Sequence, residues 1–105
     1  MKHYPANSSI FLGEDYLIKG VAGAIFWRLL GLYAESGRTE FTNRELRLDP
    51  ALKLPDIDDN LEARLILLQR RLCERGNDIL IEKTGRGRFR LVLNRGVLLQ
   101  EMPGR

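Results

Sequence analysis

The hydrophobic pattern changes its period at Gly76, and this change constrains the fold more than any other feature of the chain. Before Gly76, leucines recur every three or four residues, as they do along one side of a helix, here from residue 58 or 59 to about 75. The leucines of this stripe are Leu61, Leu65, Leu68 and Leu72. After Gly76, residues 79–83 and 88–93 have the composition of two strands, joined by a loop with two glycines. A long helix followed by a hairpin predicts an α+β fold.

The length of the chain limits it to one core. Its 105 residues correspond to a single domain, 1–105, in which we expect 1–8 to form a loose lead-in and 100–105 a loose tail. Hydrophobic residues make up 44% and charged residues 30% of the sequence, which excludes collagen-like and wholly disordered chains. We therefore expect a folded domain.

Apolar runs and cysteine usage indicate the compartment. The longest purely apolar stretch near the amino end, residues 21–27, is far shorter than the roughly 20 residues of a membrane span. No apolar run has the charged flank and small-residue cleavage site of a leader. Cys73 is the only cysteine, so a disulfide within the chain is excluded. These features predict a cytoplasmic protein that does not cross a membrane.

The amino-terminal half predicts strands followed by two helices. Residues 9–16 suit either one edge strand or two short strands with a turn at 13–15. From residue 17 to 36, apolar residues at helical spacing predict a helix, and Gly37 stands where a glycine stop is expected. Thr42 and Glu45 have the spacing of a capping box, so we expect a short helix that ends before Asp49 and Pro50.

Five segments, spread over most of the chain, carry a family resemblance. They are Phe26-Trp-Arg-Leu-Leu30, Ser36-Gly-Arg38, Phe41-Thr-Asn-Arg-Glu-Leu46, Leu65 to Leu72 and Thr84-Gly-Arg-Gly-Arg-Phe-Arg90. In these segments the chain resembles the winged-helix DNA-binding domain of OmpR/PhoB-type response regulators. The resemblance implies a winged helix-turn-helix with three helices, a small antiparallel sheet and a C-terminal hairpin wing. It also implies transcription regulation by the output domain of a larger signalling protein, with double-stranded DNA as partner.

Basic residues gather on the third helix and the hairpin, where the resemblance implies DNA contacts. Three arginines of the helix line up beside the leucine stripe, and they either contact phosphate or form a solvated face. Around the glycine loop, basic side chains either reach phosphates or protect an exposed hairpin edge. The predicted nucleic-acid-binding residues are Arg64, Arg71, Arg75, Lys83, Arg86, Arg88 and Arg90.

Two positions of the family's recognition helix lack their usual arginines. This chain has Leu67 and Gln69 there, so we expect weak discrimination between base pairs. Ile66 and Leu67 lie away from the leucine stripe, on separate sides of the helix. Either other parts of the domain cover them or they form a partner surface.

The alternative function is protein interaction without sequence-specific DNA binding. Its candidate interface consists of Trp27, Ile66 and Leu67. Trp27 lies among small residues of the first helix, a surface that suits homodimerisation or docking to an adjacent signalling domain. The competing interpretation is that the amino-terminal strand or the carboxyl-terminal tail covers Trp27.

Catalytic and metal-binding residues are not expected. His3 and Cys73 are the only residues of their types, so one chain cannot form a His/Cys metal cage. The glycine pairs at 20–23 and 85–87 lack the rest of a phosphate loop or a dinucleotide motif. Acidic residues at 56–62 suit the start of the long helix better than a cation. We therefore expect a protein that is not an enzyme and has no cofactor and no metal.

Overall fold

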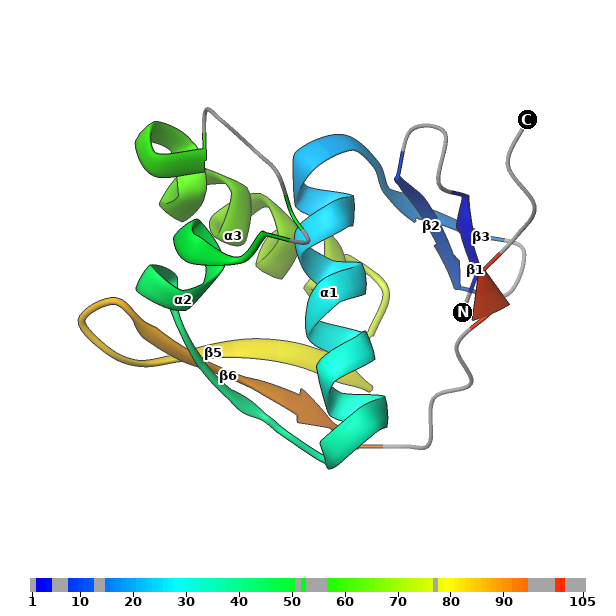
Figure 1. Ribbon diagram of the computed structural model, residues 1–105. Helices are drawn as coiled ribbons and strands as arrows, with labels where there is room; N and C mark the ends of the chain where they lie inside the picture. The colour runs from blue at the N-terminus through cyan, green and yellow to red at the C-terminus, as the bar shows by residue number, and fades with distance from the viewer. Residues whose placement is uncertain are drawn as a thin grey trace.

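The structure, a computed structural model, describes residues 2–4, 8–12, 15–50, 52, 57–76, 78–94 and 100–101. Within these ranges the chain forms three helices and seven short strands (Figure 1). The helices are α1 (Gly20–Ser36), α2 (Asn43–Leu48) and α3 (Ile57–Glu74). The strands are β1 (Lys2–Tyr4), β2 (Ser9–Leu12), β3 (Asp15–Ile18), β4 (Glu40–Thr42), β5 (Ile79–Gly85), β6 (Arg88–Leu93) and β7 (Gln100–Glu101). The predicted α+β class with three helices is confirmed, whereas the one small antiparallel sheet that we expected is replaced by two small sheets.

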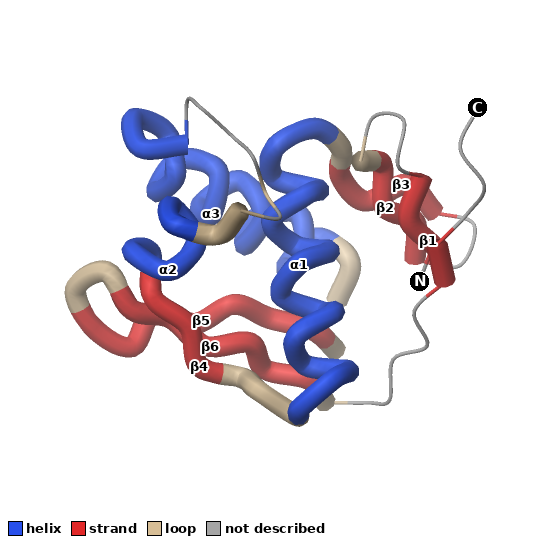
Figure 2. Tube along the Cα trace, viewed as in Figure 1, coloured by secondary structure: helices blue, strands red, loops and turns tan. Residues whose placement is uncertain are grey.

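The strands form two sheets, and α1 lies between them (Figure 2). One sheet has the order β3-β2-β1-β7, in which only the β1–β7 pair is parallel. The other has the order β4-β6-β5 and is antiparallel throughout. Because α1 contacts β2 and α3, and α3 contacts β5, the helices join both sheets into one packed body.

The leucine stripe of α3 lies in the core, as predicted. All four of its side chains are buried, namely Leu61, Leu65, Leu68 and Leu72. The same cluster holds the apolar side of α1 and the stacked rings of Phe41 and Phe89, whose centroids are 5.8 Å apart. Since these rings come from β4 and β6, the core connects α1 and α3 to the hairpin sheet. The opposite side of α3 remains outside the core.

The first helix begins later than its apolar pattern predicts. α1 starts at Gly20 because Leu17 and Ile18 belong to β3, where both are buried. The two-strand alternative for residues 9–16 is therefore confirmed, and residues 13 and 14 of the expected turn lie outside the described ranges. At its other end α1 stops at Ser36, as predicted, and the Gly37 N–H donates to the Tyr33 carbonyl oxygen at 2.7 Å.

The two chain ends differ from the predicted loose lead-in and tail. Residues 2–4 form β1, which pairs with β2, and residues 100–101 form β7, which pairs with β1. Strands of two or three residues have no hydrophobic period of their own, and they form only where a neighbouring strand supplies hydrogen bonds. A sequence pattern therefore cannot reveal them. The remaining residues of the expected lead-in and tail, apart from Ser8, lie outside the described part of the chain.

The short helix, the long helix and the hairpin are confirmed with small shifts in their ends. α2 begins with the predicted capping box, in which Thr42 Oγ1 accepts from the Glu45 N–H at 3.2 Å. The side chains of Asp58 and Asp59, the expected caps of α3, lie outside the described residues. β5 runs to Gly85, and Gly87 in the turn has a φ of 66°, the positive value expected of the glycine loop.

Candidate nucleic-acid interface

An open hollow lies between the start of α2, α3 and the turn of the β5–β6 hairpin. Its volume is about 490 Å³, within the size range of ligand-binding clefts. It is lined by Thr42, Asn43, Arg44, Arg47, Glu62, Arg86, Gly87 and Arg88. We call it the arginine hollow, because four of these eight residues are arginines.

Asn43 connects the three walls of the arginine hollow. The residue is buried at the start of α2, and its backbone N–H donates to the Gly87 carbonyl oxygen at 2.9 Å. This bond ties α2 to the hairpin turn. The Asn43 Nδ2 group donates to Glu62 Oε1 at 3.0 Å, which ties α2 to α3. Hydrogen bonds therefore set the positions of the walls relative to one another.

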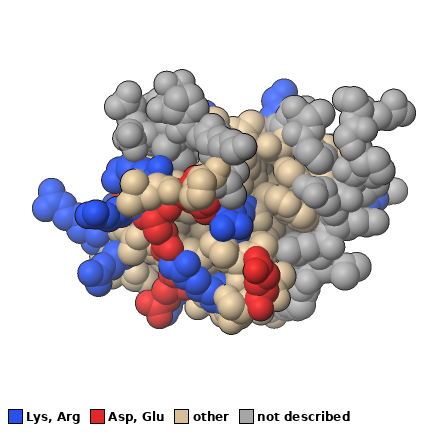
Figure 3. Space-filling model, in the orientation of Figure 1, with Lys and Arg blue, Asp and Glu red and all other residues tan. Residues whose placement is uncertain are grey.

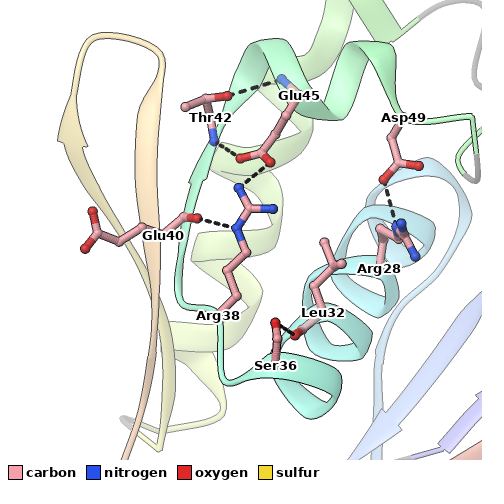
Figure 4. A network of polar contacts seen from close by, with 8 residues as sticks. All are labelled: Arg28, Leu32, Ser36, Arg38, Glu40, Thr42, Glu45 and Asp49. Atoms are coloured by element: carbon pink, nitrogen blue, oxygen red, sulfur yellow. Dashed lines mark hydrogen bonds and ion pairs between the residues drawn. The ribbon is translucent and has the colours of Figure 1, made fainter.

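A second set of polar contacts orients the amino end of α2 (Figure 4). The Glu45 carboxylate accepts from the Thr42 N–H at 2.6 Å and also contacts the Arg38 guanidinium. Arg38 Nε donates in turn to the Glu40 carbonyl oxygen at 3.0 Å. The capping box is thus attached to the strand that precedes it, β4, which pairs with β6 of the hairpin.

An ion pair fixes the carboxyl end of α2. Arg28 Nε, from the middle of α1, donates to Asp49 Oδ2 at 2.7 Å (Figure 4). Asp49 directly follows α2. Since both ends of this short helix are anchored, the two arginines that it carries, Arg44 and Arg47, have a defined place beside the hairpin turn.

The arginine hollow presents positive charge to solvent. Arg44, Arg86 and Arg88 are exposed, and none of them has a hydrogen-bond or ion-pair partner among the residues that the structure describes. Glu62 is the one acidic residue in the lining, and its Oε1 accepts from Asn43 and lies 3.7 Å from Lys83 Nζ. In Figure 3, Lys and Arg side chains gather on the side where Figure 1 places α2 and the hairpin turn. Guanidinium groups stay protonated in proteins, so this charge is permanent.

The residues predicted to bind nucleic acid divide into two groups. Arg86 and Arg88 line the arginine hollow, and Arg64 is half-buried on α3 with no polar partner in the described ranges. The other four have partners at 2.6–3.7 Å: Arg71 with Glu74, Arg75 with the Tyr16 carbonyl oxygen, Lys83 with Glu62 and Arg90 with Glu82. A cation beside a carboxylate is partly neutralised, so the first group offers the more available charge.

Sequence reasoning missed Asn43, Arg44 and Arg47. The two arginines stand three residues apart after the capping box, which places them near each other on the exposed side of a short helix. That spacing could have indicated a second basic surface on the short helix. No comparable signal marks Asn43, because its role depends on where α3 and the hairpin pack.

A narrower groove adjoins the arginine hollow, between α3 and the hairpin. Its volume is about 70 Å³, too small for a drug-sized ligand. It is lined by Asn43, Glu62, Leu65, Ile66, Gln69, Ile81, Lys83, Arg88 and Phe89, and we call it the α3 groove. Asn43, Glu62 and Arg88 line both depressions, so the α3 groove continues directly from the arginine hollow.

Two large apolar side chains are exposed on α3, where the resemblance implies a reading surface, and Gln69 and Arg70 are exposed beside them. Ile66 is 54% exposed and Leu67 is 38% exposed. One alternative for these two side chains was that other parts of the domain cover them. The described residues leave both of them exposed. Ile66 also lines the α3 groove, whereas Leu67 does not.

Trp27 has a different environment. It is half-buried, and the imidazole of His3 stacks on its indole with 4.6 Å between centroids. His3 belongs to β1, so the amino-terminal strand covers one face of this ring, as the competing interpretation proposed.

Comparisons with known proteins do not place the chain in a family. A scan against protein-family models and searches of curated proteins and of solved structures find no match. None of the helices in the described part is both long and apolar enough to cross a bilayer. The same part of the chain contains no group of three His, Cys, Asp or Glu residues placed to hold a metal ion. The functional evidence is therefore the geometry of the arginine hollow and the α3 groove.

Proposed function

We propose that this chain is a winged-helix module that binds double-stranded DNA and acts in transcription regulation, as the output domain of a larger signalling protein. The order of the elements supports such a fold, with α2 and α3 as the helix-turn-helix and the β5–β6 hairpin as the wing. The observation that carries the function is the arginine hollow. Three of its arginines are exposed and lack polar partners among the described residues.

Duplex DNA suits this surface for electrostatic reasons. Its backbone carries one negative charge per about 1.7 Å of helix axis, so a row of phosphates can approach several guanidinium groups together. Each guanidinium can donate two parallel hydrogen bonds to a phosphate. The hollow lies between α2, α3 and the hairpin turn, and a strand that crosses it would therefore meet all three elements.

The polar partners of each cation indicate how much it can contribute to phosphate binding. Arg44, Arg86 and Arg88 contribute most, and Arg64 can add a contact from α3. Lys83 contributes less, because its Nζ lies 3.7 Å from Glu62 Oε1. The cations held by Glu74, Glu82 and the Tyr16 carbonyl contribute least, namely Arg71, Arg90 and Arg75.

The test is the salt dependence of binding to a labelled random duplex, measured by fluorescence anisotropy. Affinity should fall with salt along a log-log slope of about −0.9 for each phosphate that the protein neutralises. Arg86→Ala/Arg88→Ala should weaken binding and make the slope shallower by about 1.8, that is, by two such contacts. Arg90→Ala is the control, because Arg90 lies on β6 like Arg88 but pairs with Glu82 at 2.7 Å. Binding that is undetectable at low salt rejects the function.

The second candidate is a winged helix that binds protein. The exposure of Ile66 and Leu67 favours it, since open apolar side chains on a helix commonly mark an interface. Its partner would be a second copy of the chain or an adjacent signalling domain. Sedimentation of the wild type and of Ile66→Ala separates the candidates: a dimer that dissociates in the variant, without any DNA binding, supports protein interaction.

A further inference from the structure

The outward side of α3 carries two exposed aliphatic side chains, Ile66 and Leu67. From this side and its position beside the arginine hollow, we infer that α3 recognises thymine methyl groups in the major groove, with Ile66 and Leu67 as the residues that contact them. This inference rests on the proposed function and specifies which duplexes the site prefers.

Exposure identifies the residues that can reach a base edge. In the middle of α3, Ala63, Ile66, Leu67 and Arg70 are exposed, whereas Leu65 is buried. Ala63 and Arg70 are seven residues apart and lie on the same side of the helix. Ile66 and Leu67 each stand three or four residues from both of them, so they border this side. Ile66 and Leu67, about 100° apart around the helix axis, therefore flank the line from Ala63 to Arg70.

The α3 groove links Ile66 to the proposed phosphate contacts. Ile66 and Arg88 line the same groove, and Arg88 also lines the arginine hollow. A duplex whose phosphates lie in the hollow would then place the adjoining major groove against α3. Arg88 favours a polyanion over an apolar protein surface here, since it lines the groove with Ile66 and has no carboxylate partner among the described residues, whereas Lys83 lies 3.7 Å from Glu62.

The major-groove edges of the bases determine the direction of the preference. Adenine, guanine and cytosine present hydrogen-bond donors and acceptors there, whereas thymine also presents a C5 methyl group. An aliphatic side chain placed against a donor or acceptor leaves that group without water or a partner, which is unfavourable. Against a methyl group the same side chain buries apolar surface. Ile66 and Leu67 should therefore favour sites that are rich in thymine.

The decisive probe changes the methyl group alone. We would compare alternating adenine-thymine duplexes of two helical turns, about 20 base pairs, with duplexes of the same sequence in which deoxyuridine replaces thymidine. Alternating sequences offer the same groups in every register, so an unknown binding site does not matter. A second pair compares alternating guanine-cytosine duplexes with and without 5-methylcytosine, which places a methyl group at the equivalent position.

We expect the methylated member of each pair to bind more tightly, by about threefold to fivefold for each methyl group that is buried. Ile66→Ala and Leu67→Ala should weaken binding to the methylated duplexes and reduce the difference between the members of each pair. Leu48→Ala is the matched control, because Leu48 is a 69% exposed leucine on α2 that lines neither depression. Thermal unfolding of each variant verifies that the fold is retained.

The outcomes separate the inference from the function on which it rests. Salt-dependent binding that ignores the methyl group in both pairs overturns the inference and leaves DNA binding intact. A methyl preference that persists unchanged in both α3 variants overturns the assignment to Ile66 and Leu67. Failure to bind any duplex at low salt overturns the proposed function and the inference together. A preference for the methylated duplex that appears in both pairs and disappears in Ile66→Ala and Leu67→Ala supports the inference.

Discussion

The imidazole of His3 lies stacked on the indole of Trp27, with 4.6 Å between the ring centroids and 14° between the ring planes. The contact joins β1 to the middle of α1, and His3 is buried. Since β1 also pairs with β2 and β7, the stack attaches the amino-terminal sheet to the helical core. One face of the Trp27 indole is therefore in contact with the chain's own first strand.

Removal of this stack should be measurable from the tryptophan itself. We expect His3→Ala to lower the free energy of unfolding by at least about 1 kcal/mol, because stacked aromatic pairs contribute about 0.5–1.5 kcal/mol beyond the area they bury and the imidazole is itself buried. Trp27 is the only tryptophan, so its emission should move to longer wavelength as its ring becomes hydrated. Urea unfolding followed by this emission measures both effects. Lys2→Ala, on the same strand, should change neither, and an unaltered emission maximum in His3→Ala would contradict the stack.

Two glycines of α1 should respond in opposite ways to the same substitution. A Cβ atom added at Gly23 would lie 2.1 Å from the Ser8 carbonyl oxygen, whereas one added at Gly31 would meet nothing within 4 Å. Gly23→Ala must push the backbone at Ser8 away from α1, so we expect a loss of about 1–3 kcal/mol of stability, as in other overpacked sites. Gly31→Ala should instead gain about 0.5–1 kcal/mol from the better helix propensity of alanine. Thermal or urea unfolding of both variants tests the pair, and equal effects would contradict the close approach at Ser8.

Asn43 should be necessary for both the stability of the fold and the shape of the arginine hollow. Its Nδ2 group donates to Glu62, so Asn43→Ala should cost about 1 kcal/mol, the net contribution of such a hydrogen bond, because the exposed Glu62 carboxylate that is left can bind water. Asn43→Asp should cost more, because it would place a second carboxylate beside Glu62 in a partly buried site. Urea unfolding at neutral pH gives the two values. A ranking in which aspartate is tolerated better than alanine would contradict the hydrogen bond to Glu62.

Local signals were sufficient to predict the helices and the hairpin. The leucine stripe of α3, the glycine after α1 and the capping box of Thr42 and Glu45 each depend on residues close together in sequence, and each is present. The alternation in β6 likewise buries Phe89 and Leu91 and exposes the arginines between and before them. Such features follow from helical or strand periodicity, so one sequence is enough to predict them.

Features that depend on distant partners were not predictable. β4 pairs with β6 across almost fifty residues, as Phe41 opposite Phe89 illustrates, and its three residues carry no period. The charges show the same limit. Arg88 and Arg90 are equivalent in the sequence pattern, yet the structure gives a carboxylate partner to Arg90 and none to Arg88 within the described ranges. Which cation remains available depends on side chains from other elements, and no local pattern encodes that choice.

Glu62 should limit the affinity of the arginine hollow for DNA. Its carboxylate is the one acidic group in the lining of the hollow and lies 3.7 Å from Lys83 Nζ. Glu62→Gln removes the negative charge but keeps an oxygen that can accept from Asn43 Nδ2, so the walls of the hollow should stay in place. Removal of a carboxylate from a phosphate-binding surface also releases Lys83 to act as a further phosphate contact.

We therefore expect Glu62→Gln to bind duplex DNA more tightly at low salt and to make the log-log salt slope steeper by about 0.9, the contribution of one additional phosphate. Glu35→Gln is the matched control, since it changes the net charge equally at an exposed position that lines neither depression. If the two substitutions raise the affinity for DNA equally, the increase comes from net charge alone. A larger effect of Glu62→Gln, lost again in Glu62→Gln/Lys83→Ala, would place the gain at this pair, because only there does the removed carboxylate hold a cation beside the arginine hollow.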